Sequence, residues 1–394
     1  MTADATLLAP ALSPAAEARR IAREVAAPHA DAVDRDARFP AEAVAALRAS
    51  GLLGAAVPGP QGPGCGLAAL AGACFELGQA CGSTAMVFAM HQIQVASLLH
   101  HGGPWHRDYL ARLARDGLLL ASATTEAGTG GDVRSSDCAV RDADGMVAVE
   151  KAGCVISYAA EADGVLVTAR RAPDAPPADQ VLLLAERAQC TLRQTAGWDV
   201  LGMRGTCSEG YTLAVRAPAA QLLPVPYATI SARSMLPVSH ILWSATWLGI
   251  ATAATLRARA AVRARARAAS PGTPPHGGAR LAEALGQLQA MRALVGDAVR
   301  RHERAAGDEA MLESIPFVLA MNQLKTTAST LAVQVVGQCM LVAGLAAYRN
   351  DTPFSLGRHL RDAHSAALMI GNDRILGNCA GLLAAYRAEE PLFP

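Results

Sequence analysis

The sequence predicts a mostly α-helical protein in which a β-rich segment separates an N-terminal helical region from a C-terminal helical bundle. The composition favours helices, because alanine and leucine carry much of the 52% hydrophobic content and only 4% of the residues are aromatic. Short segments rich in β-branched residues begin after residue 118, and helical spacing returns after Ser231. We therefore expect an α-helical domain over 1–118, a β-sheet or barrel domain over 119–228 and a four-helix bundle over 229–394.

The bulk composition restricts the classes of function. A chain of 394 residues can bury a large core, and its 35 basic and 34 acidic residues leave no overall field that recruits nucleic acid or an anionic membrane. The nine cysteines include no C-x-x-C pair, which argues against a zinc site or a disulfide framework. The N-terminus lacks a secretory-signal pattern, and no apolar run reaches the roughly 18–20 residues that span a bilayer. We expect a cytoplasmic protein with no nucleic-acid partner, no metal and no membrane span.

Proline and glycine divide the helical pattern of the first 118 residues. Pro40 stands at a first helical position, and Gly51 is a plausible stop for that helix. Two mostly apolar helices meet near residue 82, and helices that are apolar on most faces are buried. The other expected elements are an amphipathic helix over 15–29, a Pro/Gly loop over 57–66 and a short helix over 105–115.

Between residues 119 and about 225 the pattern is that of strands. Runs of Val, Leu, Ile, Thr and Tyr alternate with turn residues such as those at 142–145 and 173–177. We expect a compact antiparallel sheet or barrel. Its candidate strands are the segments 117–125, 146–153, 154–160, 164–171, 180–186, 191–196 and 211–218.

The C-terminal region has the pattern of four long helices with short connections, which is typical of an antiparallel bundle. The expected helices cover 239–270, 280–306, 314–347 and about 356–386, with a break at SPGTPPHGG over 270–278. The first of them ends in an arginine repeat over 257–267. This repeat is either a patch for nucleic acid or lipid, or a solvated helix face or subunit contact, and the balancing acidic residues favour the second interpretation.

One loop, ASATTEAGTGGD over 121–132, has the composition of a ligand-binding segment. Backbone N–H groups at its three glycines, together with the hydroxyls of Thr124, Thr125 and Thr129, are suited to a flat polar or anionic cofactor. No phosphate motif is complete, and an ordinary surface turn has the same composition. The loop alone therefore leaves both interpretations open.

Short motifs in order along the chain resemble those of the acyl-CoA dehydrogenase superfamily of FAD flavoproteins. Phe39-Pro40, with the GLLGAAVPGPQGPGCG segment after it, is similar to the FP and Gly/Pro-rich motif, and TTEAGTGGD at 124–132 is similar to T-E-P-x-x-G-S-D. LGMRGT at 201–206, QVVG at 334–337 and RDA at 361–363 resemble three further motifs in the same order. The resemblance implies an acyl-CoA dehydrogenase-like fold and an FAD-dependent oxidoreductase that forms a homotetramer or homodimer.

The resemblance also implies contacts to the flavin ring. Thr125 matches the position at the flavin pyrimidine edge, with Gly130 and Gly131 in the same loop, and Gly131 replaces a serine so that its hydroxyl is absent. Val155, Ile156 and Ser157 match the segment at the flavin face, with Val155 in place of a shielding tryptophan. Ser157 is the hydroxyl candidate for flavin N5, or else a strand serine bonded to backbone.

Three further residues correspond to superfamily positions that bind the rest of FAD. Gln334 and Gly337 resemble the segment that binds the adenosine-diphosphate portion from a neighbouring subunit. Arg265 or Arg267 stands near the arginine of the bundle's first hairpin, although the following SPGTPP departs from R-x-x-F-G. We take Arg265 as the candidate of the two.

The usual catalytic base of the superfamily is missing. Dehydrogenation of an acyl thioester requires a carboxylate that removes the α-proton while a hydride moves to flavin N5. Counting from RDA, Ile370 occupies the position of the superfamily glutamate, and the second superfamily position for a base aligns near Ser239-His240, also without a carboxylate. Isoleucine cannot accept a proton.

Two titratable residues are the candidate catalytic replacements. His240 lies on an apolar stretch and is either a proton acceptor or a satisfied core histidine. Asp373 lies about one helical turn past Ile370 and either reaches back to the site or pairs with an arginine. His364 and His91 are further candidates, and Glu126 has the structural role that the resemblance implies for its motif.

The missing base leaves three classes of function open. The first choice is oxidation of an acyl thioester, bound to CoA or to a carrier protein, at Cα–Cβ in a specialised pathway, with electron-transfer flavoprotein or O2 as electron acceptor. The second is a flavin monooxygenase that takes reduced FMN or FAD as a co-substrate together with O2, since superfamily members of that kind lack the glutamate. The third is a catalytically silent partner that binds acyl thioesters.

Overall fold

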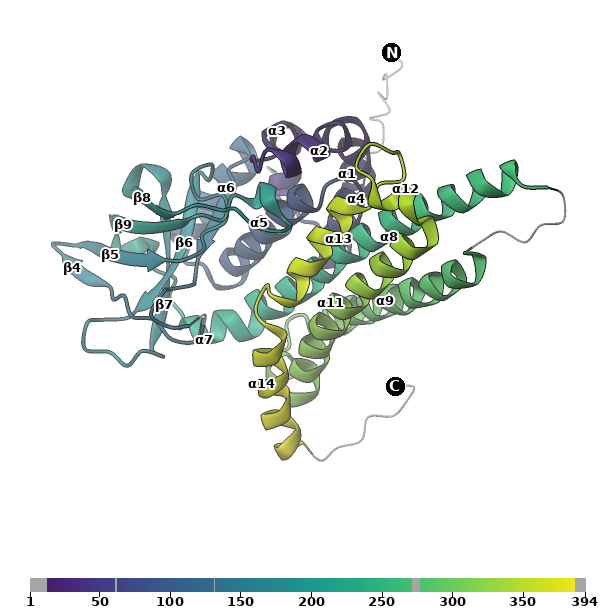
Figure 1. The fold of residues 1–394 in the computed structure, drawn as a ribbon. Coiled ribbons are helices and arrows are strands. Elements are labelled where there is room, and N and C mark those ends of the chain that lie inside the picture. The colour runs from purple at the N-terminus through teal and green to yellow at the C-terminus, as the bar shows by residue number, and fades with distance from the viewer. Residues whose placement is uncertain (1–12, 61, 131, 271–276, 387–394) are drawn as a thin grey trace, which may run out of the picture.

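The computed structural model describes residues 13–60, 62–130, 132–270 and 277–386. Figure 1 shows the strands on one side of the molecule and the long C-terminal helices on the other, with the N-terminal helices against both. This order of helical, β and helical regions is the architecture that the sequence predicts.

The N-terminal region is helical, as predicted. Its first helix begins after the Ser13 N-cap and continues through a π-helical segment, Ala22–Ala26, so that it is longer than the periodicity indicates. Cys81 separates the two apolar helices where the sequence predicts a division. The helices are α1 (Pro14–Ile21), α2 (Ala27–Arg35), α3 (Ala41–Ala49), α4 (Leu67–Ala80), α5 (Gly82–His101) and α6 (Pro104–Asp116), and the Pro/Gly segment holds the two-residue strands β1 (Pro58–Gly59) and β2 (Gly62–Pro63).

The middle region forms two small sheets instead of one antiparallel sheet. The first has the order β3 (Leu120–Ala123), β6 (Gly164–Arg170), β7 (Gln180–Glu186), and the second has the order β4 (Arg141–Ala143), β5 (Met146–Gly153), β9 (Gly210–Pro218), β8 (Cys190–Ala196). Strands β3 and β6 pair in parallel, with Leu120 opposite Gly164. A parallel pair needs a long connection, and the forty residues between them, which include the ligand-like loop and β4–β5, provide it.

The segment 154–160, predicted as a strand, is a turn-rich connection between β5 and β6. Its backbone bonds to two other segments, since the Ile156 N–H donates to the Glu209 carbonyl and the Tyr158 N–H to the Thr206 carbonyl. Tyr158 has a φ of 41°, which no regular strand contains. This segment therefore presents Val155 and Ser157 on a loop.

The C-terminal region contains three of the four long helices that the sequence predicts. The fourth, expected to run unbroken over 356–386, is two helices separated by a turn at Ile370, whose φ is 51°. Apolar periodicity continues across this turn, which is why it was not predicted. The helices are α7 (Tyr227–Ile230), α8 (Leu236–Ala268), α9 (Gly278–Ala305), α10 (Glu309–Glu313), α11 (Ile315–Ala343), α12 (Leu345–Tyr348), α13 (Gly357–His364) and α14 (Asn372–Ala385).

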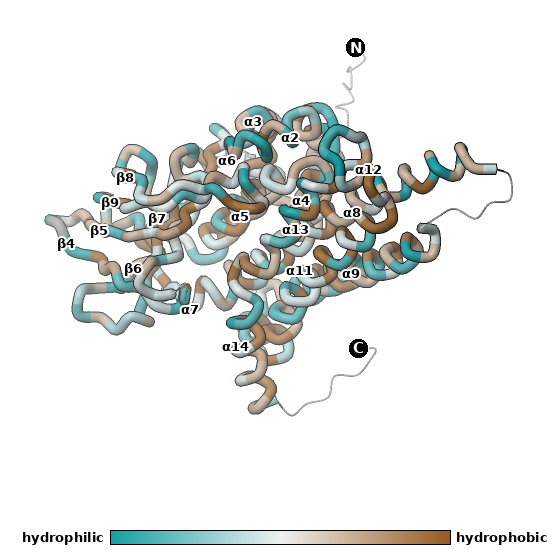
Figure 2. The backbone as a smooth tube through the Cα atoms, viewed as in Figure 1, coloured by the Kyte–Doolittle hydropathy of each residue, from teal (hydrophilic) through white to brown (hydrophobic). Residues whose placement is uncertain are grey.

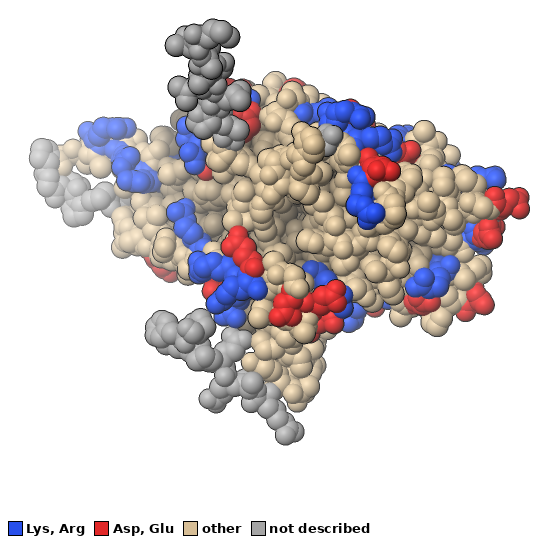
Figure 3. Space-filling view, turned by 180° about the vertical axis from the view of Figure 1, so that it is seen from behind, with Lys and Arg blue, Asp and Glu red and all other residues tan. Residues whose placement is uncertain are grey.

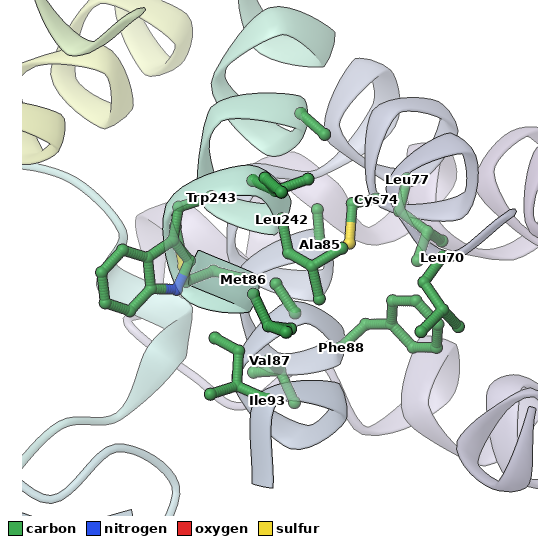
Figure 4. Packing of buried hydrophobic residues seen from close by; sticks show 14 of the residues in the cluster. Leu70, Cys74, Leu77, Ala85, Met86, Val87, Phe88, Ile93, Leu242 and Trp243 are labelled. Atoms are coloured by element: carbon green, nitrogen blue, oxygen red, sulfur yellow. The ribbon is translucent and has the colours of Figure 1, made fainter. Parts of the chain in front are cut away.

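The core joins the helical regions through α4, α5 and α8. Helices α4 and α8 approach closely because Gly78 and Gly249 lack side chains, and a Cβ on Gly78 would lie 2.6 Å from the Thr246 carbonyl oxygen. Figure 4 shows Leu70, Cys74 and Leu77 of α4 packed beside Leu242 of α8 and side chains of α5. All nine cysteines are free, as the sequence predicts for a chain without a disulfide framework.

Helix α11 departs from the expectation that no apolar run is long enough to cross a membrane. It has 29 residues and a mean hydropathy of 1.3 over its most apolar window, values that a membrane-spanning helix also has. Half of that window is buried inside the molecule. Helix α11 is thus a core helix of the bundle, packed against α8 and α9.

The charged surface is mixed in sign. On the face opposite to that of Figure 1, acidic and basic side chains lie in small groups beside one another (Figure 3). The arginine-rich end of α8 alternates between hydrophilic and hydrophobic residues (Figure 2). There Arg257 donates to the Ser355 carbonyl at 2.7 Å, and Arg265 donates to the Val342 carbonyl. These arginines hold neighbouring segments of the chain.

Candidate active site

A cavity of about 500 Å³ lies where the three regions meet. Its wall combines one face of α5, the first turns of α8, loops of the middle region and the segment from α13 to the turn at Ile370. Most of the lining is apolar. The apolar side chains are Met86, Met90, Ile93, Val133, Val155, Trp198, Val200, Leu201, Met203, Met235, Leu236, Trp243, Leu368, Met369 and Ile370.

Two of the motifs meet at the rim of this cavity. The backbone of Gly202 packs directly on the Arg361 carbonyl, where any side chain would collide. The buried Asp362 accepts a hydrogen bond at 2.7 Å from the Met203 N–H, and burial raises the pKa of this carboxyl to about 6. LGMRGT and RDA therefore join the middle region to the bundle, and their side chains Arg361 and Met203 contribute to the lining.

The middle region presents hydroxyl groups to the cavity. Thr125 Oγ1 donates to the Val155 carbonyl at 3.0 Å, which ties the ligand-like loop to the 154–160 segment. Ser157 and Ser208 share a hydrogen bond of 2.8 Å between their hydroxyls, and Ser208 shares another of 2.8 Å with Thr206. Thr206 donates to the Met203 carbonyl at 2.9 Å. Thr125, Ser157, Thr206 and Ser208 all line the cavity. The sequence did not identify Thr206 and Ser208 as site residues.

The predicted flavin contacts divide into two groups by position. Thr125, Val155 and Ser157 line the cavity together, as the resemblance implies. Ile156 is fully buried and packs against Gly153 instead. Gly130 has a φ of 58° and its carbonyl accepts a hydrogen bond from Arg374 at 2.9 Å, outside the cavity lining. Gly131 lies outside the described residues.

The residues expected to bind the remainder of FAD lie on the long helices away from this cavity. Gln334 is exposed on α11 and Gly337 is partly exposed, so both are accessible to a neighbouring subunit. The Arg265 guanidinium donates to the Val342 carbonyl. Their roles toward a cofactor stay predictions.

Glu126 has the structural role that was predicted for it. It is 4% exposed and accepts hydrogen bonds from Lys151 at 2.5 Å, from the Asp137 N–H at 2.8 Å and from the Ser136 hydroxyl. Burial opposes ionisation of this carboxyl, but the bonds from Lys151 and Ser136 outweigh it and hold the pKa below its ordinary value. This network ties the middle of the ligand-like loop to β5 and to residues 136–138.

His240 does not line the cavity, although its neighbours Ser239 and Trp243 do. Its Nδ1 lies 3.0 Å from the Met321 carbonyl of α11, a distance at which the imidazole donates a proton. Burial lowers the pKa of His240 to about 4, so it is neutral in the folded chain. The placement agrees with the core-histidine interpretation and corrects the expectation that its side chain reaches the flavin face.

Asp373 is also outside the cavity. The expectation that it reaches back by one helical turn assumed a continuous helix, and the chain instead turns at Ile370. Asp373 is exposed in the first turn of α14, where a carboxylate is favoured by the helix dipole. The alternative expectation, that Asp373 pairs with an arginine, is not met among the described residues. The neighbouring Arg374 instead forms an ion pair with Asp132 at 3.6 Å.

Of the two remaining histidine candidates, only His364 lines the cavity. His91 is fully buried, with Nε2 lying 2.8 Å from the Leu53 carbonyl and Nδ1 accepting from the Leu120 N–H at 3.0 Å. Both of its ring nitrogens are therefore occupied. His364 is exposed at the end of α13 and is the histidine with access to the site.

Ile370 lies on the cavity wall where the resemblance expects a glutamate, and a buried lysine holds it there. Lys325 of α11 donates to the Ile370 carbonyl at 2.6 Å and to Asn372 Oδ1 at 2.8 Å. Burial lowers the pKa of Lys325 to about 8. A β-branched residue with positive φ is disfavoured, so these bonds hold a conformation that Ile370 would not adopt alone. No local signal in the sequence identifies Lys325.

Comparison with known proteins agrees with this fold. Residues 13–117 match the model of the acyl-CoA dehydrogenase N-terminal domain, and residues 230–381 match that of the C-terminal domain. The chain belongs to the acyl-CoA dehydrogenase superfamily of flavoproteins. Within the superfamily, the hydroxyl-bearing edge at Thr125 and Ser157, facing an apolar wall, fits a flavin ring, which has a polar edge and flat faces.

Its relatives differ in their named activities. The probable acyl-CoA dehydrogenase YngJ of Bacillus subtilis is 27% identical, over 90% of this chain and 92% of its own. The amino sugar nitrososynthase DnmZ of Streptomyces peucetius is 26% identical, over 85% of this chain and 84% of its own. The structure of FMN-bound TdsC from Paenibacillus sp. A11-2 superposes with a TM-score of 0.83, at 20% identity over 96% of this chain and 99% of that chain.

Proposed function

We propose that the protein is a flavin-dependent monooxygenase that takes a reduced flavin and O2 and oxidises an apolar substrate in the cavity. The observation that carries this proposal is the cavity wall, which among the described residues includes no aspartate or glutamate. Dehydrogenation at Cα–Cβ needs a base for the α-proton. Monooxygenation does not need that base, because the oxidant comes from O2: one oxygen atom enters the substrate, the other leaves as water, and the flavin is oxidised.

The apolar lining supports the same chemistry. A reduced flavin would supply the two electrons that activate O2, and water in the site would divert them. The Met, Leu, Ile and Trp side chains of the wall give the space beside Ser157 an apolar lining that binds water poorly. Residues 368–370 form one side of this space, and Lys325 holds the Ile370 carbonyl there.

The hydrogen-bonded hydroxyls of Ser157, Ser208 and Thr206, here called the hydroxyl chain, favour a reduced flavin over an oxidised one. Each hydroxyl has one proton to donate. Thr206 donates to the Met203 carbonyl, so Ser208 donates to Thr206 and Ser157 donates to Ser208. The Ser157 oxygen then offers only lone pairs to the cavity. At the position that the resemblance assigns to flavin N5, such an acceptor suits the reduced ring, which carries a hydrogen on N5.

Two of the similar proteins add support. DnmZ is named a nitrososynthase, and TdsC is named a dibenzothiophene monooxygenase and binds FMN. We extend that kind of chemistry to this chain, with FMN or FAD bound as the reduced co-substrate at the edge formed by Thr125 and Ser157.

Dehydrogenation of an acyl thioester is the second candidate, and a specific observation favours it. His364 has access to the cavity, so it could accept the α-proton in place of the missing carboxylate. YngJ carries the name of an acyl-CoA dehydrogenase. In this alternative the substrate is bound to CoA or a carrier protein, and electron-transfer flavoprotein or O2 reoxidises the flavin.

One pair of measurements separates the two. The purified full-length protein is mixed with chemically reduced FMN or FAD, and oxygen uptake is followed with and without a panel of aromatic substrates. We expect oxygen uptake above the rate of the reduced flavin alone. With ¹⁸O2, we expect the product to contain one atom of ¹⁸O. In parallel, protein loaded with oxidised FAD is mixed anaerobically with a panel of acyl-CoAs. Flavin bleaching there, lost in His364→Ala, together with no ¹⁸O incorporation, would overturn the monooxygenase proposal.

A further inference from the structure

We propose that Met90 is a site of self-oxidation: when a reduced flavin and O2 react in the cavity without a substrate, the peroxide that they form converts the Met90 thioether to a sulfoxide. This modification rests on the proposed function in one respect, because it requires a reduced flavin and O2 to meet in the cavity. It goes beyond that function, because the oxygen atom enters a side chain of the wall and not a substrate.

Methionine is concentrated in the wall of the cavity. The thioether sulfur of methionine is polarisable, and oxidation to the sulfoxide turns a flexible apolar side chain into a polar one. Five of the eleven methionines of the chain line this one cavity, so oxidisable sulfur lies on several sides of the space in which the oxidant would form. These five are Met86, Met90, Met203, Met235 and Met369.

Met90 is the methionine of α5 that is open to the cavity. From Gly82 to Leu98 every other residue of the helix is buried, whereas Met90 is partly exposed. Met86 and Ile93 lie on the same helix face, about one turn on either side, and both line the cavity. The exposed surface of Met90 therefore faces the cavity.

The other four methionines of the wall are less suited to this role. Met86 is fully buried within the cluster of Figure 4, and Met203 is 3% exposed. Met235 is 9% exposed, and its sulfur accepts a hydrogen bond from the Tyr227 hydroxyl at 3.5 Å, which engages a lone pair. Met369 is partly exposed between two exposed neighbours in the sequence, so solvent also reaches it.

Hydrogen bonds place Met90 on the same side of the cavity as the proposed flavin edge. His91, the next residue, accepts a hydrogen bond at its Nδ1 from the Leu120 N–H at 3.0 Å. The Leu120 carbonyl accepts another at 3.0 Å from the Tyr158 hydroxyl, and Tyr158 follows Ser157 in the chain. An oxidant that forms beside Ser157 therefore forms on the side of the cavity that contains Met90.

The oxidation balances with no further reagent. O2 takes two electrons and two protons from the reduced flavin and becomes hydrogen peroxide. The Met90 sulfur attacks one peroxide oxygen, so that an S–O bond forms and the O–O bond breaks. Sulfur is oxidised by two electrons, and the other oxygen leaves as water with both hydrogens. Peroxide that forms inside a cavity of about 500 Å³ meets Met90 at an effective concentration far above that in solution.

Peptide mass spectrometry with labelled oxygen tests the assignment. The full-length protein is incubated with chemically reduced FMN or FAD under ¹⁸O2, with no substrate and with catalase to remove peroxide from solution. We expect the Met90 peptide to gain one ¹⁸O atom in a fraction of molecules at least about fivefold larger than for Met311. Met311 is the control for oxidation in solution, because it is 43% exposed on α10 and does not line the cavity.

Two further comparisons assign the label to the cavity. Hydrogen peroxide added to protein without flavin gives the ratio of Met90 to Met311 oxidation that accessibility alone produces, and the flavin reaction should exceed that ratio. Met90→Leu nearly conserves volume and should lose most of the ¹⁸O that the whole protein gains, whereas Met86→Leu, one turn away, should keep it. A Met90 label no larger than the Met311 label, a ratio equal to that with added hydrogen peroxide, or equal ¹⁸O gain in the two variants would overturn the self-oxidation of Met90.

These outcomes are separate from those of the proposed function. Product that carries ¹⁸O from the panel of aromatic substrates, together with an unlabelled Met90, would reject self-oxidation and leave the monooxygenase proposal in place. A labelled Met90 together with no ¹⁸O in any product would do the reverse, because the side chain reports the oxidant without a substrate.

Discussion

The chain contains only two lysines among its 35 basic residues, and both are fully buried beside a loop of the candidate site. Lys151 of β5 supports the ligand-like loop through the carboxylate of Glu126 at 2.5 Å, and it also donates to the Thr168 carbonyl at 2.8 Å. Lys325 of α11 supports the turn at Ile370 through two neutral oxygens. One buried charge is therefore neutralised by a partner and the other is not.

The difference separates the two walls of the cavity. The wall of the middle region is held by an ion pair with several further hydrogen bonds, an arrangement that resists movement. The wall at Ile370 depends on one ammonium group with a lowered pKa and on a residue in a disfavoured conformation. We expect the wall of the middle region to be rigid and the wall at Ile370 to open more easily. A rigid wall suits the proposed flavin ring, and a wall that opens suits the entry of a substrate.

The largest effect is expected for Lys151→Met. This change leaves the Glu126 carboxylate buried without its partner, and we expect the free energy of unfolding to fall by about 3–5 kcal/mol. Denaturant unfolding followed by circular dichroism measures it. The double variant Lys151→Met/Glu126→Gln should recover part of the loss, since it removes the unpaired charge. A loss below about 1 kcal/mol in the single variant would contradict the idea that this pair fixes the loop.

A smaller effect is expected for Lys325→Met. It removes hydrogen bonds to the Ile370 carbonyl and to Asn372, but it also removes a poorly solvated charge, so we expect a loss of only about 1 kcal/mol. The local consequence is larger: amide hydrogen exchange over residues 368–372 should accelerate, while exchange over 121–130 should not. Equal acceleration in both segments would mean that the two walls are not independent.

The pH dependence of Lys325→Met gives a control with a definite sign. The pKa of Lys325 falls from 10.5 to about 8 on folding, so the unfolded chain binds more protons between these values and stability rises with pH across that window. This contribution should disappear in the methionine variant. Unfolding curves of both proteins at pH 8 and pH 10 isolate it as a difference, independent of other groups that titrate there.

His240 extends the comparison to a buried group that stays neutral. Its pKa falls from 6.5 to about 4, so the unfolded chain binds more protons between these values and stability is lost as pH falls from 6.5 toward 4. The slope of the unfolding free energy against pH reflects the number of protons taken up on unfolding. In His240→Gln this number should fall by up to one over this window. If His240 were instead the catalytic base, the variant would abolish turnover and leave that slope unchanged.

The smallest effect is expected for Ser208→Ala, which tests the hydroxyl chain on the rigid wall. Without Ser208 the Ser157 hydroxyl has no acceptor within the chain, so it becomes free to donate toward the cavity. We expect the ratio of affinities for reduced and oxidised flavin to fall a few-fold, measured by equilibrium dialysis under anaerobic and aerobic conditions. Thr212→Ala, on β9 and outside the cavity lining, is the matched control and should not change the ratio.

Local signals in the sequence determined the order of the regions, most of the helices and the structural role of Glu126. Periodicity, proline and glycine act over a few residues. The resemblance of the contiguous motifs to the superfamily implied that Thr125, Val155 and Ser157 share one site and that Ile370 stands at the position of the superfamily glutamate. For His240 the sequence left two interpretations open, a proton acceptor or a core histidine.

Tertiary structure decided everything that depends on residues far apart in the chain. The parallel pairing of β3 with β6, the turn that separates α13 from α14 and the inward position of His240 all follow from contacts between residues 44 to 81 positions apart. The support of Ile370 by Lys325 is of the same kind. Burial and hydrogen-bond satisfaction are properties of the packed chain, and a residue's own neighbours in sequence do not specify them.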